Sequence, residues 1–281
     1  GTELGLFVSY EGGLKWQPLL MKNMPRVAVH DLLVHPRDND LVVATHGRGI
    51  AIFDDATALQ QMTPAIAAER AHLFAPREGL RINRTSNYSM MGDDGFYGPN
   101  PPAGALLTYH VAAKPAKEKP LKLHIFDANG MKVAEVRNPP AEAGLNRAAW
   151  NLRFDAPKPR KEAAPGEADS EGARGGALGA VPALPGRYTV KLLLGDEVVS
   201  EQPLVVKVDP TIQVSQSELQ QQFDQCLKLR HMITGVNNAL RDLDRAKTQL
   251  ESNEKLAPAS MKARLAEMKK ATVDRGVGAS V

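Results

Sequence analysis

The feature that most constrains this chain is a turn motif close to its N-terminus. Four residues with the spacing Ser-x-acid-x-Gly-x-x-Trp form the motif: Ser9, Glu11, Gly13 and Trp16. In such a hairpin turn the small and acidic residues hold the loop, and the Trp is expected to pack between neighbouring sheets. Further short β-like runs follow, separated by turns rich in Gly, Pro, Asn or Asp: residues 29–35, 41–45 and 50–53.

This succession of short strands predicts one blade of a β-propeller over residues 1–57. The run 41–45 is nearly continuously apolar, which is typical of a strand that is buried. A blade buries its faces only against other blades. We therefore expect the chain to be the tail of a longer protein, whose binding or active site is assembled with blades that lie upstream.

The middle of the chain predicts a connector and loop over residues 58–102, followed by an all-β sandwich over residues 103–210. The run 121–126 alternates with period two, and the Asn-Gly turn that follows it favours a hairpin. Six or seven short strands in about a hundred residues favour an immunoglobulin-like sandwich. Residues 156–184 are rich in Pro, Ala, Gly, Lys and Glu without an aromatic residue, so we expect a flexible insertion there.

The last part of the chain, residues 215–273, predicts a helical hairpin. Two sets of apolar residues repeat every seven positions and run in step: Leu219, Cys226, Ile233 and Leu240, and Leu229, Val236, Leu243 and Leu250. Such a stripe requires another helix against it. A second helix from 259 to 271 would supply it, and sustained heptads also leave open a homodimer through this tail. The predicted fold is therefore mainly β with an α-helical tail.

Composition excludes several classes of protein. The net charge is 35 − 32 = +3 with both signs mixed, which is too weak a bias for nucleic-acid binding. The single cysteine, Cys226, rules out an internal disulfide and a Cys-rich metal site, and its place on the apolar stripe indicates a small buried hydrophobe. No apolar run approaches the length of a membrane span. No motif for a phosphate, a cofactor or a metal is present, so we expect none of these ligands.

Three segments carry a resemblance to a known group: GTELGLFVS at 1–9, VHDL at 29–32 and HPRDNDLVVATHGRG at 35–49. They resemble the last blade of bacterial BNR/Asp-box propeller proteins, which are often labelled sortilin-like or glycosyl-hydrolase-like. PGRYTV at 185–190 is similar to the immunoglobulin-like domain that follows the propeller in that group. The chain departs from the Asp-box pattern at Glu11, where the box usually has Asp. That position is structural in this fold and does not predict catalysis.

The resemblance implies a large propeller, an accessory β-sandwich and a helical tail, exported to the periplasm or the outside of a bacterial cell. It does not imply one reaction. Propellers of this type include sialidases and xyloglucanases, but also receptors and assembly factors that carry out no chemistry.

The turn after the apolar strand 41–45 holds the candidate ligand-binding residues, His46 and Arg48. A His and an Arg together suit an anionic or sugar ligand. The same turn also has a structural explanation, in which its glycines take special φ angles and Arg48 braces the next blade. His30, Asp31 and His35 suggest an acid–base pair, but adjacent strand residues point to opposite faces and do not line one site together.

Two pairs of adjacent carboxylates are present, Asp54-Asp55 and Asp93-Asp94. Glycosidases need two carboxyl groups about 5–10 Å apart across the scissile bond, which adjacent residues alone do not provide. The second pair could hold Ca²⁺ with loop carbonyls, but it lacks the repeated Asp spacing of a calcium loop. We therefore assign no catalytic residue and no metal ligand.

Three functional hypotheses follow from the sequence. The first is the C-terminal accessory region of an exported β-propeller protein that binds protein or glycan without catalysis. The second is the accessory end of a sialidase-like or xyloglucanase-like glycoside hydrolase, with its catalytic acids upstream. The third is a structural module in which the helical tail drives oligomerisation. All three hypotheses predict contact with upstream blades, and none of them involves a cofactor or nucleic acid.

Overall fold

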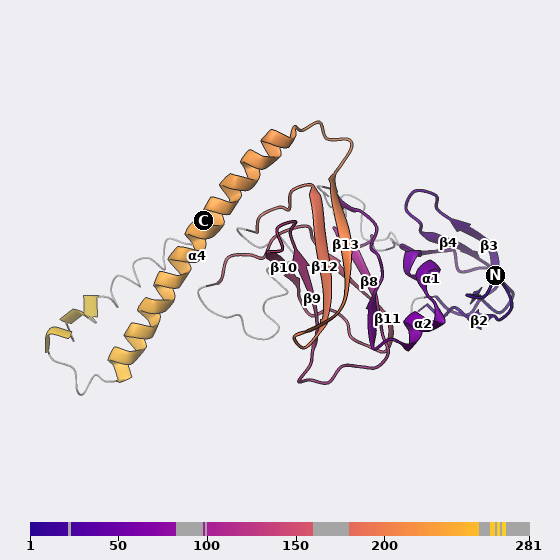
Figure 1. The fold of residues 1–281 in the computed structure, drawn as a ribbon, viewed down its shortest axis with the longest axis horizontal. Coiled ribbons are helices and arrows are strands. Elements are labelled where there is room, and N and C mark those ends of the chain that lie inside the picture. The colour runs from indigo at the N-terminus through magenta and orange to yellow at the C-terminus, as the bar shows by residue number, and fades with distance from the viewer. Residues whose placement is uncertain are drawn as a thin grey trace. The chain divides into compact units, whose positions relative to one another are not determined.

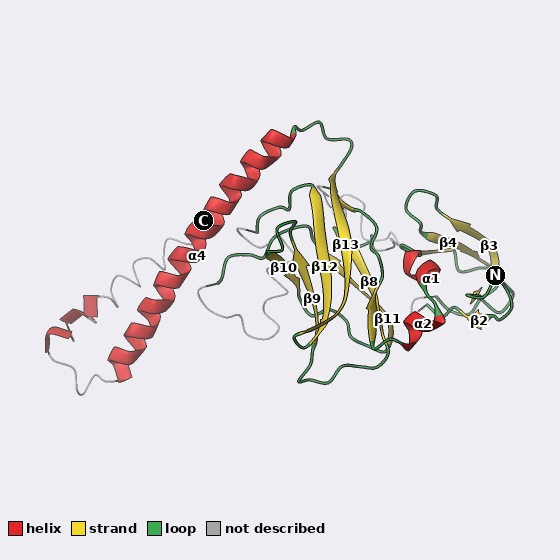
Figure 2. Cartoon of the chain, viewed as in Figure 1, coloured by secondary structure: helices red, strands yellow, loops and turns green. Residues whose placement is uncertain are grey.

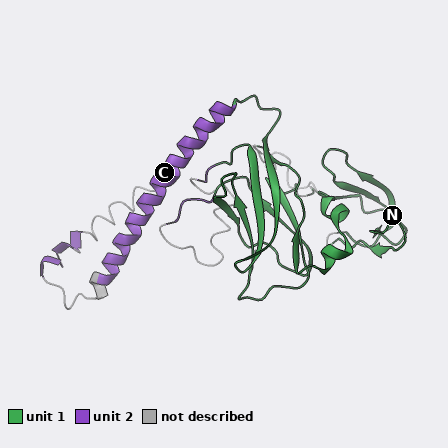
Figure 3. Cartoon of the chain, in the orientation of Figure 1, with its two compact units in different colours: residues 1–154, 182–215 green, residues 155–181, 216–281 purple. Residues whose placement is uncertain are grey.

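The computed structural model describes residues 1–21, 24–82, 98, 100–159, 180–252, 259–261, 263–264 and 266–267. The protein is mainly β, as predicted. It divides into two compact units (Figure 3). The first unit is formed by residues 1–154 and 182–215, and the second by residues 155–181 and 216–281. All named strands belong to the first unit, whereas the long helix belongs to the second (Figure 2).

The N-terminal part of the first unit contains two small antiparallel sheets. One is the hairpin of β1 (Phe7–Val8) and β2 (Gln17–Pro18). The other has the order β3-β4-β5, built from β3 (Val29–Val34), β4 (Leu41–Thr45) and β5 (Ile50–Phe53). A small core lies between the two sheets, formed by Leu6, Val29 and Val43 with partly buried Leu and Met side chains around them.

Two short helices follow these sheets, α1 (Thr57–Gln61) and α2 (Pro64–Ala68). The second begins with an N-cap, because the Thr63 side chain accepts a hydrogen bond from the Ile66 amide and Pro64 occupies the first helical turn. Both helices stop after five residues, which leads the chain directly into the larger pair of sheets.

The larger part of the first unit consists of two sheets that share one core (Figure 1). The three-stranded sheet has the order β11-β8-β6, with β11 (Gly144–Trp150), β8 (Ala105–Val111) and β6 (Ala71–Leu73). The five-stranded sheet has the order β10-β9-β12-β13-β7, with β10 (Lys132–Val136), β9 (Leu121–Phe126), β12 (Gly186–Leu194), β13 (Glu197–Val208) and β7 (Gly79–Arg81). All neighbouring strands pair antiparallel except β7 and β13, which pair parallel.

The predicted connector over residues 58–102 contributes two strands to these sheets; the sequence indicated a short strand at Leu73-Phe74, close to β6, but not β7. Strand β6 pairs with β8 in the three-stranded sheet, and β7 pairs with β13 in the five-stranded sheet. The chain therefore crosses from one sheet to the other over residues 74–78. Each of the two strands has only three residues, so neither is long enough to show a periodic pattern.

Three large aromatic residues in the core, Tyr109, Trp150 and Tyr188, satisfy their polar atoms by donating to backbone carbonyls. Trp150 Nε1 donates to Arg153 O at 2.8 Å, and Tyr188 Oη donates to Leu184 O at 2.9 Å. The Trp150 and Tyr188 rings meet edge to face with their centroids 5.1 Å apart. Burial raises the pKa of Tyr188 to about 12, so its hydroxyl stays protonated and remains a donor at neutral pH.

The second unit contains one long helix, α4 (Gln216–Ser252), where the heptad pattern predicts one. Residues 155–159 lie along it, since Arg230 Nε donates to Asp155 O at 2.8 Å and Asn237 Nδ2 donates to Lys158 O at 2.9 Å. The described residues of the predicted second helix (259–271), which are 259–261, 263–264 and 266–267, are all helical, whereas most of the predicted insertion (156–184) lies outside the described residues. Across the described part of the chain, no helix is both long and apolar enough to cross a membrane.

Gly104 lies immediately before β8, and its backbone conformation gives a testable prediction. Its φ of +106° is in the region that favours glycine, and an added β-carbon would lie 1.9 Å from the Trp150 carbonyl oxygen. We expect Gly104→Ala to lower the free energy of unfolding of the first unit by about 3 kcal/mol, measured by urea denaturation. The control is Gly235→Ala in α4, which meets open space and should stabilise the helix by about 0.5–1 kcal/mol. Equal effects of the two changes would contradict this account of Gly104.

Candidate functional site

The three-stranded sheet β3-β4-β5 is apolar on both of its faces. Directly paired residues of antiparallel strands point to the same side. Val43 is paired with Leu32 and with Ala51, and these side chains share the face that meets the small N-terminal core. The neighbouring residue of β4, Val42, is paired with Leu33 and with Ile52, so this second set of side chains points the other way.

The second face, named here the outer face, is exposed. Its members are Leu33, Val42, Ala44, Ile50 and Ile52, together with Asp31, which is paired with Ala44 and is the one charged residue of the face. The exposed fractions of its three largest side chains, Leu33, Ile50 and Ile52, lie between 56% and 70%. A contiguous aliphatic sheet face that remains exposed is typical of a surface that packs against another protein layer. The outer face is therefore a candidate docking surface.

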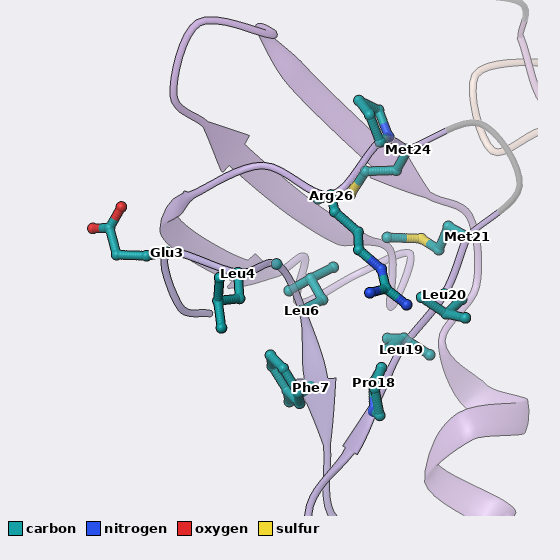
Figure 4. A pocket seen from close by; sticks show the side chains of 12 residues that line it. Glu3, Leu4, Leu6, Phe7, Pro18, Leu19, Leu20, Met21, Met24 and Arg26 are labelled. Atoms are coloured by element: carbon teal, nitrogen blue, oxygen red, sulfur yellow. The ribbon is translucent and has the colours of Figure 1, made fainter.

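An apolar pocket lies close by, between the first residues of the chain and the loop after β2 (Figure 4). Its lining includes Leu4, Phe7, Leu20 and Met21, with Glu3 and Arg26 as its charged members. Leu4 and Leu20 are largely exposed at its rim. The lining supplies no arrangement of acid, base and nucleophile, so the pocket resembles an incompletely covered edge of the small N-terminal core more than a catalytic cleft.

The predicted turn motif is held mainly by Ser9. Its Oγ accepts hydrogen bonds from the Gly13 amide at 2.8 Å and from the Glu11 amide at 3.3 Å. The Glu11 carboxylate instead lies 3.8 Å from Lys15 Nζ, as a weak surface ion pair. Trp16 is 64% exposed, although the motif predicts that it packs between sheets. Ser9 thus closes the loop, and the indole adds a further apolar group to the exposed surface.

His46 and Arg48 lie in the turn between β4 and β5, and both are exposed. The turn is closed by Thr45, whose amide and hydroxyl both donate to Gly49 O, while Gly47 and Gly49 have φ angles of +70°. The structure adds one neighbour that spacing did not predict, since the His30 ring lies 5.0 Å from the His46 ring. Two imidazoles and a guanidinium on one exposed end of the sheet suit an anionic or polar ligand.

His35, the other histidine considered from the sequence, belongs to a different turn. Its Nδ1 is 3.2 Å from the Asp38 amide that donates to it, and its own amide donates to Asp40 O. His35 therefore closes the turn between β3 and β4 and does not join His30 in one site.

Asp55 is the buried member of a partly buried ionic cluster that sequence reasoning did not identify. Its amide donates to Asp40 Oδ1 at 2.8 Å, and its Oδ2 lies 3.9 Å from Arg77 Nε. Arg77 Nη1 also donates to Asp38 O and lies 3.5 Å from Asp40 Oδ1. Arg77 lies in the segment between β6 and β7, so these contacts tie the larger sheets to the N-terminal sheet.

Arg147 of β11 completes the cluster. Its Nη2 donates to Asp55 O at 3.2 Å, its Nε donates to Thr108 Oγ1 at 3.4 Å, and its guanidinium lies 4.9 Å from the centre of the Phe53 ring. Burial lowers the pKa of Arg147. We name Arg77, Arg147, Asp40 and Asp55 the arginine brace, because together they hold the N-terminal sheet against the larger sheets.

The second carboxylate pair, Asp93-Asp94, lies outside the described residues, so the calcium loop considered there stays untested. Within the residues that the structure describes, no three metal-ligating side chains come together. Searches with protein-family models, curated proteins and solved structures found no match to this chain. Functional inference therefore depends on the geometry of the outer face, the His46–Arg48 turn and the arginine brace.

Asp54 gives a pH-dependent prediction for the region of the brace. Burial, and then the nearby Asp40 carboxylate, raises the pKa of Asp54. The protonated Asp54 carboxyl therefore contributes fully to stability below the pKa that this group has in the unfolded chain, about 4. This contribution is lost as the pH rises through the higher pKa of Asp54 in the folded protein. We expect Asp54→Asn, which is neutral at every pH, to unfold at a higher urea concentration than the parent at pH 7, with the difference shrinking toward pH 4.

The matched control for Asp54→Asn is Asp196→Asn, at a side chain that is 100% exposed. Its unfolding midpoint should follow that of the parent at both pH values. An Asp54→Asn protein that is less stable than the parent at pH 7 would show that attraction to Arg147 outweighs burial at this position.

Proposed function

We propose that this chain is a non-catalytic interaction region of an exported bacterial β-propeller protein, in which residues 1–57 form a terminal blade. One observation carries the proposal: the sheet β3-β4-β5 is apolar on both faces, and its outer face is exposed. A propeller blade is covered on each face by a neighbouring blade, which accounts for a sheet with two apolar faces. Covering Leu33, Ile50 and Ile52 would contribute about 1–2 kcal/mol for each side chain.

Two further features support a blade of the BNR/Asp-box type. The Ser9 side chain closes the hairpin turn through two backbone amides, as the motif requires of its small residue. Trp16 follows that turn with most of its indole exposed, and a neighbouring blade would cover it. The resemblance to this group, and with it a periplasmic or extracellular location, is part of the proposal.

The two larger sheets support an immunoglobulin-like domain after the blade. In that fold β6, β8 and β11 would be strands A, B and E, and β10, β9, β12 and β13 would be strands C′, C, F and G. The hydrogen bond from Tyr188 Oη to Leu184 O resembles a tyrosine corner at the start of strand F. Trp150 packs against this tyrosine in the shared core.

The hydrolase alternative places its catalytic acids in upstream blades, and the carboxylates described here favour a structural role. Asp40 accepts from the Asp55 amide and faces Arg77, while Asp55 is buried and its Oδ1 accepts from the Thr57 amide at 3.2 Å. A catalytic pair needs open space between its carboxyl groups for the sugar. The brace fills that space with guanidinium groups.

The docking claim predicts the behaviour of a double variant, Ile50→Glu with Ile52→Glu. Both side chains are exposed on the outer face, so the chain should still fold. We expect the variant to lose the part of the self-association that depends on the outer face and to bind an apolar dye severalfold less, because charges replace the apolar face. Sedimentation velocity and dye fluorescence measure the two effects.

The matched control is Leu145→Glu with Val198→Glu, which changes two exposed apolar residues of the larger sheets. This control should keep the association and the dye binding of the parent chain. An equal loss of association and dye binding in both double variants would mean that the outer face associates no more strongly than other exposed apolar surface. That result would remove the main support for a blade.

The non-catalytic claim is tested by offering a panel of oligosaccharides to the purified chain. We expect any sugar that binds to do so at the His46–Arg48 turn, so that His46→Ala with Arg48→Ala weakens binding by roughly tenfold or more, while Arg187→Ala does not. Calorimetry measures binding, and a reducing-sugar assay measures turnover. Sugar release that Asp54→Asn abolishes would contradict the proposal and favour the hydrolase.

A further inference from the structure

Helix α4 carries an apolar seam that remains exposed in the structure. Its members are spaced alternately three and four residues apart: Leu229, Met232, Val236, Ala239, Leu243, Ala246 and Leu250. The exposed fractions of the four largest described members, Leu229, Met232, Val236 and Leu243, lie between 48% and 67%. At a rise of 1.5 Å per residue the seam is about 33 Å long, which is three heptads. Such a stripe is unusual on a helix that remains solvated.

Residues 155–159 contact a side of helix α4 that differs from the side of the seam. With Leu229 at heptad position a, the residues that hold this segment, Arg230 and Asn237, both fall at position b. Position b lies on the outside of a coiled coil, away from the a and d positions that make the seam. Among the described residues of this unit, these contacts therefore leave the seam uncovered.

We propose that the seam packs against the same seam of a second copy of this chain, as a parallel, in-register, two-stranded coiled coil. The heptad positions that flank the seam support this partner. Asp242 is at position g and Lys247 is at the following position e, five residues later. In a parallel pair these two residues face each other across the interface, on both sides of the dimer.

The same charges argue against the antiparallel arrangement, in which g faces g and e faces e, so that Asp242 and Lys247 do not meet. The seam also has a defined start. The two preceding a and d positions are Gln222 and Gln225, so the apolar pairing begins at Leu229. The half-buried Ile233 and Leu240 at position e broaden the contact beside the core positions.

The inference is independent of the propeller proposal, and the experiment keeps the two apart. All proteins carry Ile50→Glu and Ile52→Glu, so association through the outer face is removed. Sedimentation equilibrium of this full-length chain should give twice the monomer mass. Met232→Lys with Val236→Lys should raise the dimer dissociation constant by roughly 100-fold or more, because two lysines would enter the core positions of each helix.

The matched control is His231→Lys with Asn238→Lys, which adds the same charges at exposed c positions and should remain dimeric. Circular dichroism of each protein shows whether the helix is retained. A monomer in the starting protein, a tetramer, or equal weakening by the seam and control variants would overturn the proposal.

The relative orientation of the two helices in the dimer is tested with introduced cysteines, after Cys226→Ser removes the native thiol. Gln225→Cys lies at a d position just before the seam, and a parallel in-register pair brings its two copies together. Mild oxidation should therefore link Gln225→Cys into a covalent dimer, whereas His231→Cys at position c should stay unlinked. A seam-dependent dimer that does not link through Gln225→Cys would overturn the parallel arrangement.

Discussion

A β-sheet with two apolar faces is stable in water only when a packing partner covers each face, and the N-terminal part of this protein is built around such a sheet. Val43 and its paired residue Ala51 pack in the small N-terminal core, whereas Leu32 on the same face is 40% exposed. Val42 and its paired residues form the exposed outer face. The apolar rim at Leu4 and Leu20 and the exposed indole of Trp16 add to the exposed apolar surface of this region.

The arginine brace explains how so small a sheet keeps a fixed place within the first unit. Arg77 and Arg147 come from the larger sheets, and they reach carboxylates and carbonyls at the ends of β3 and β5. Buried charges are costly unless they are paired and hydrogen-bonded, and these groups meet that condition together. The brace determines where the N-terminal sheet lies relative to the larger sheets. Apolar contacts with a neighbouring layer would contribute most of the stability of the N-terminal sheet.

Features with a repeating local pattern could be predicted from the sequence. The alternation of β9, the continuous apolar run of β4 and the heptads of α4 each extend over enough residues to define a strand or a helix. Strand β7 was missed because three residues carry too little periodicity. The brace was missed because its partners lie 37 and 92 residues apart in the chain, so only the folded topology brings them together. In the turn between β4 and β5, the sequence identified His46 and Arg48 but did not predict that the His30 ring lies beside His46.

The most direct test of the blade is to label its outer face chemically in two contexts. Hydroxyl-radical footprinting would compare this chain alone with the same chain joined to the propeller sequence that we propose precedes it. The account predicts that Leu33, Ile50 and Ile52 are oxidised readily in the chain alone and are protected several-fold in the longer protein, while Leu145 and Val198 are oxidised equally in both. Equal oxidation of the outer face in the two proteins would mean that no neighbouring blade covers it, and the proposed function would be contradicted.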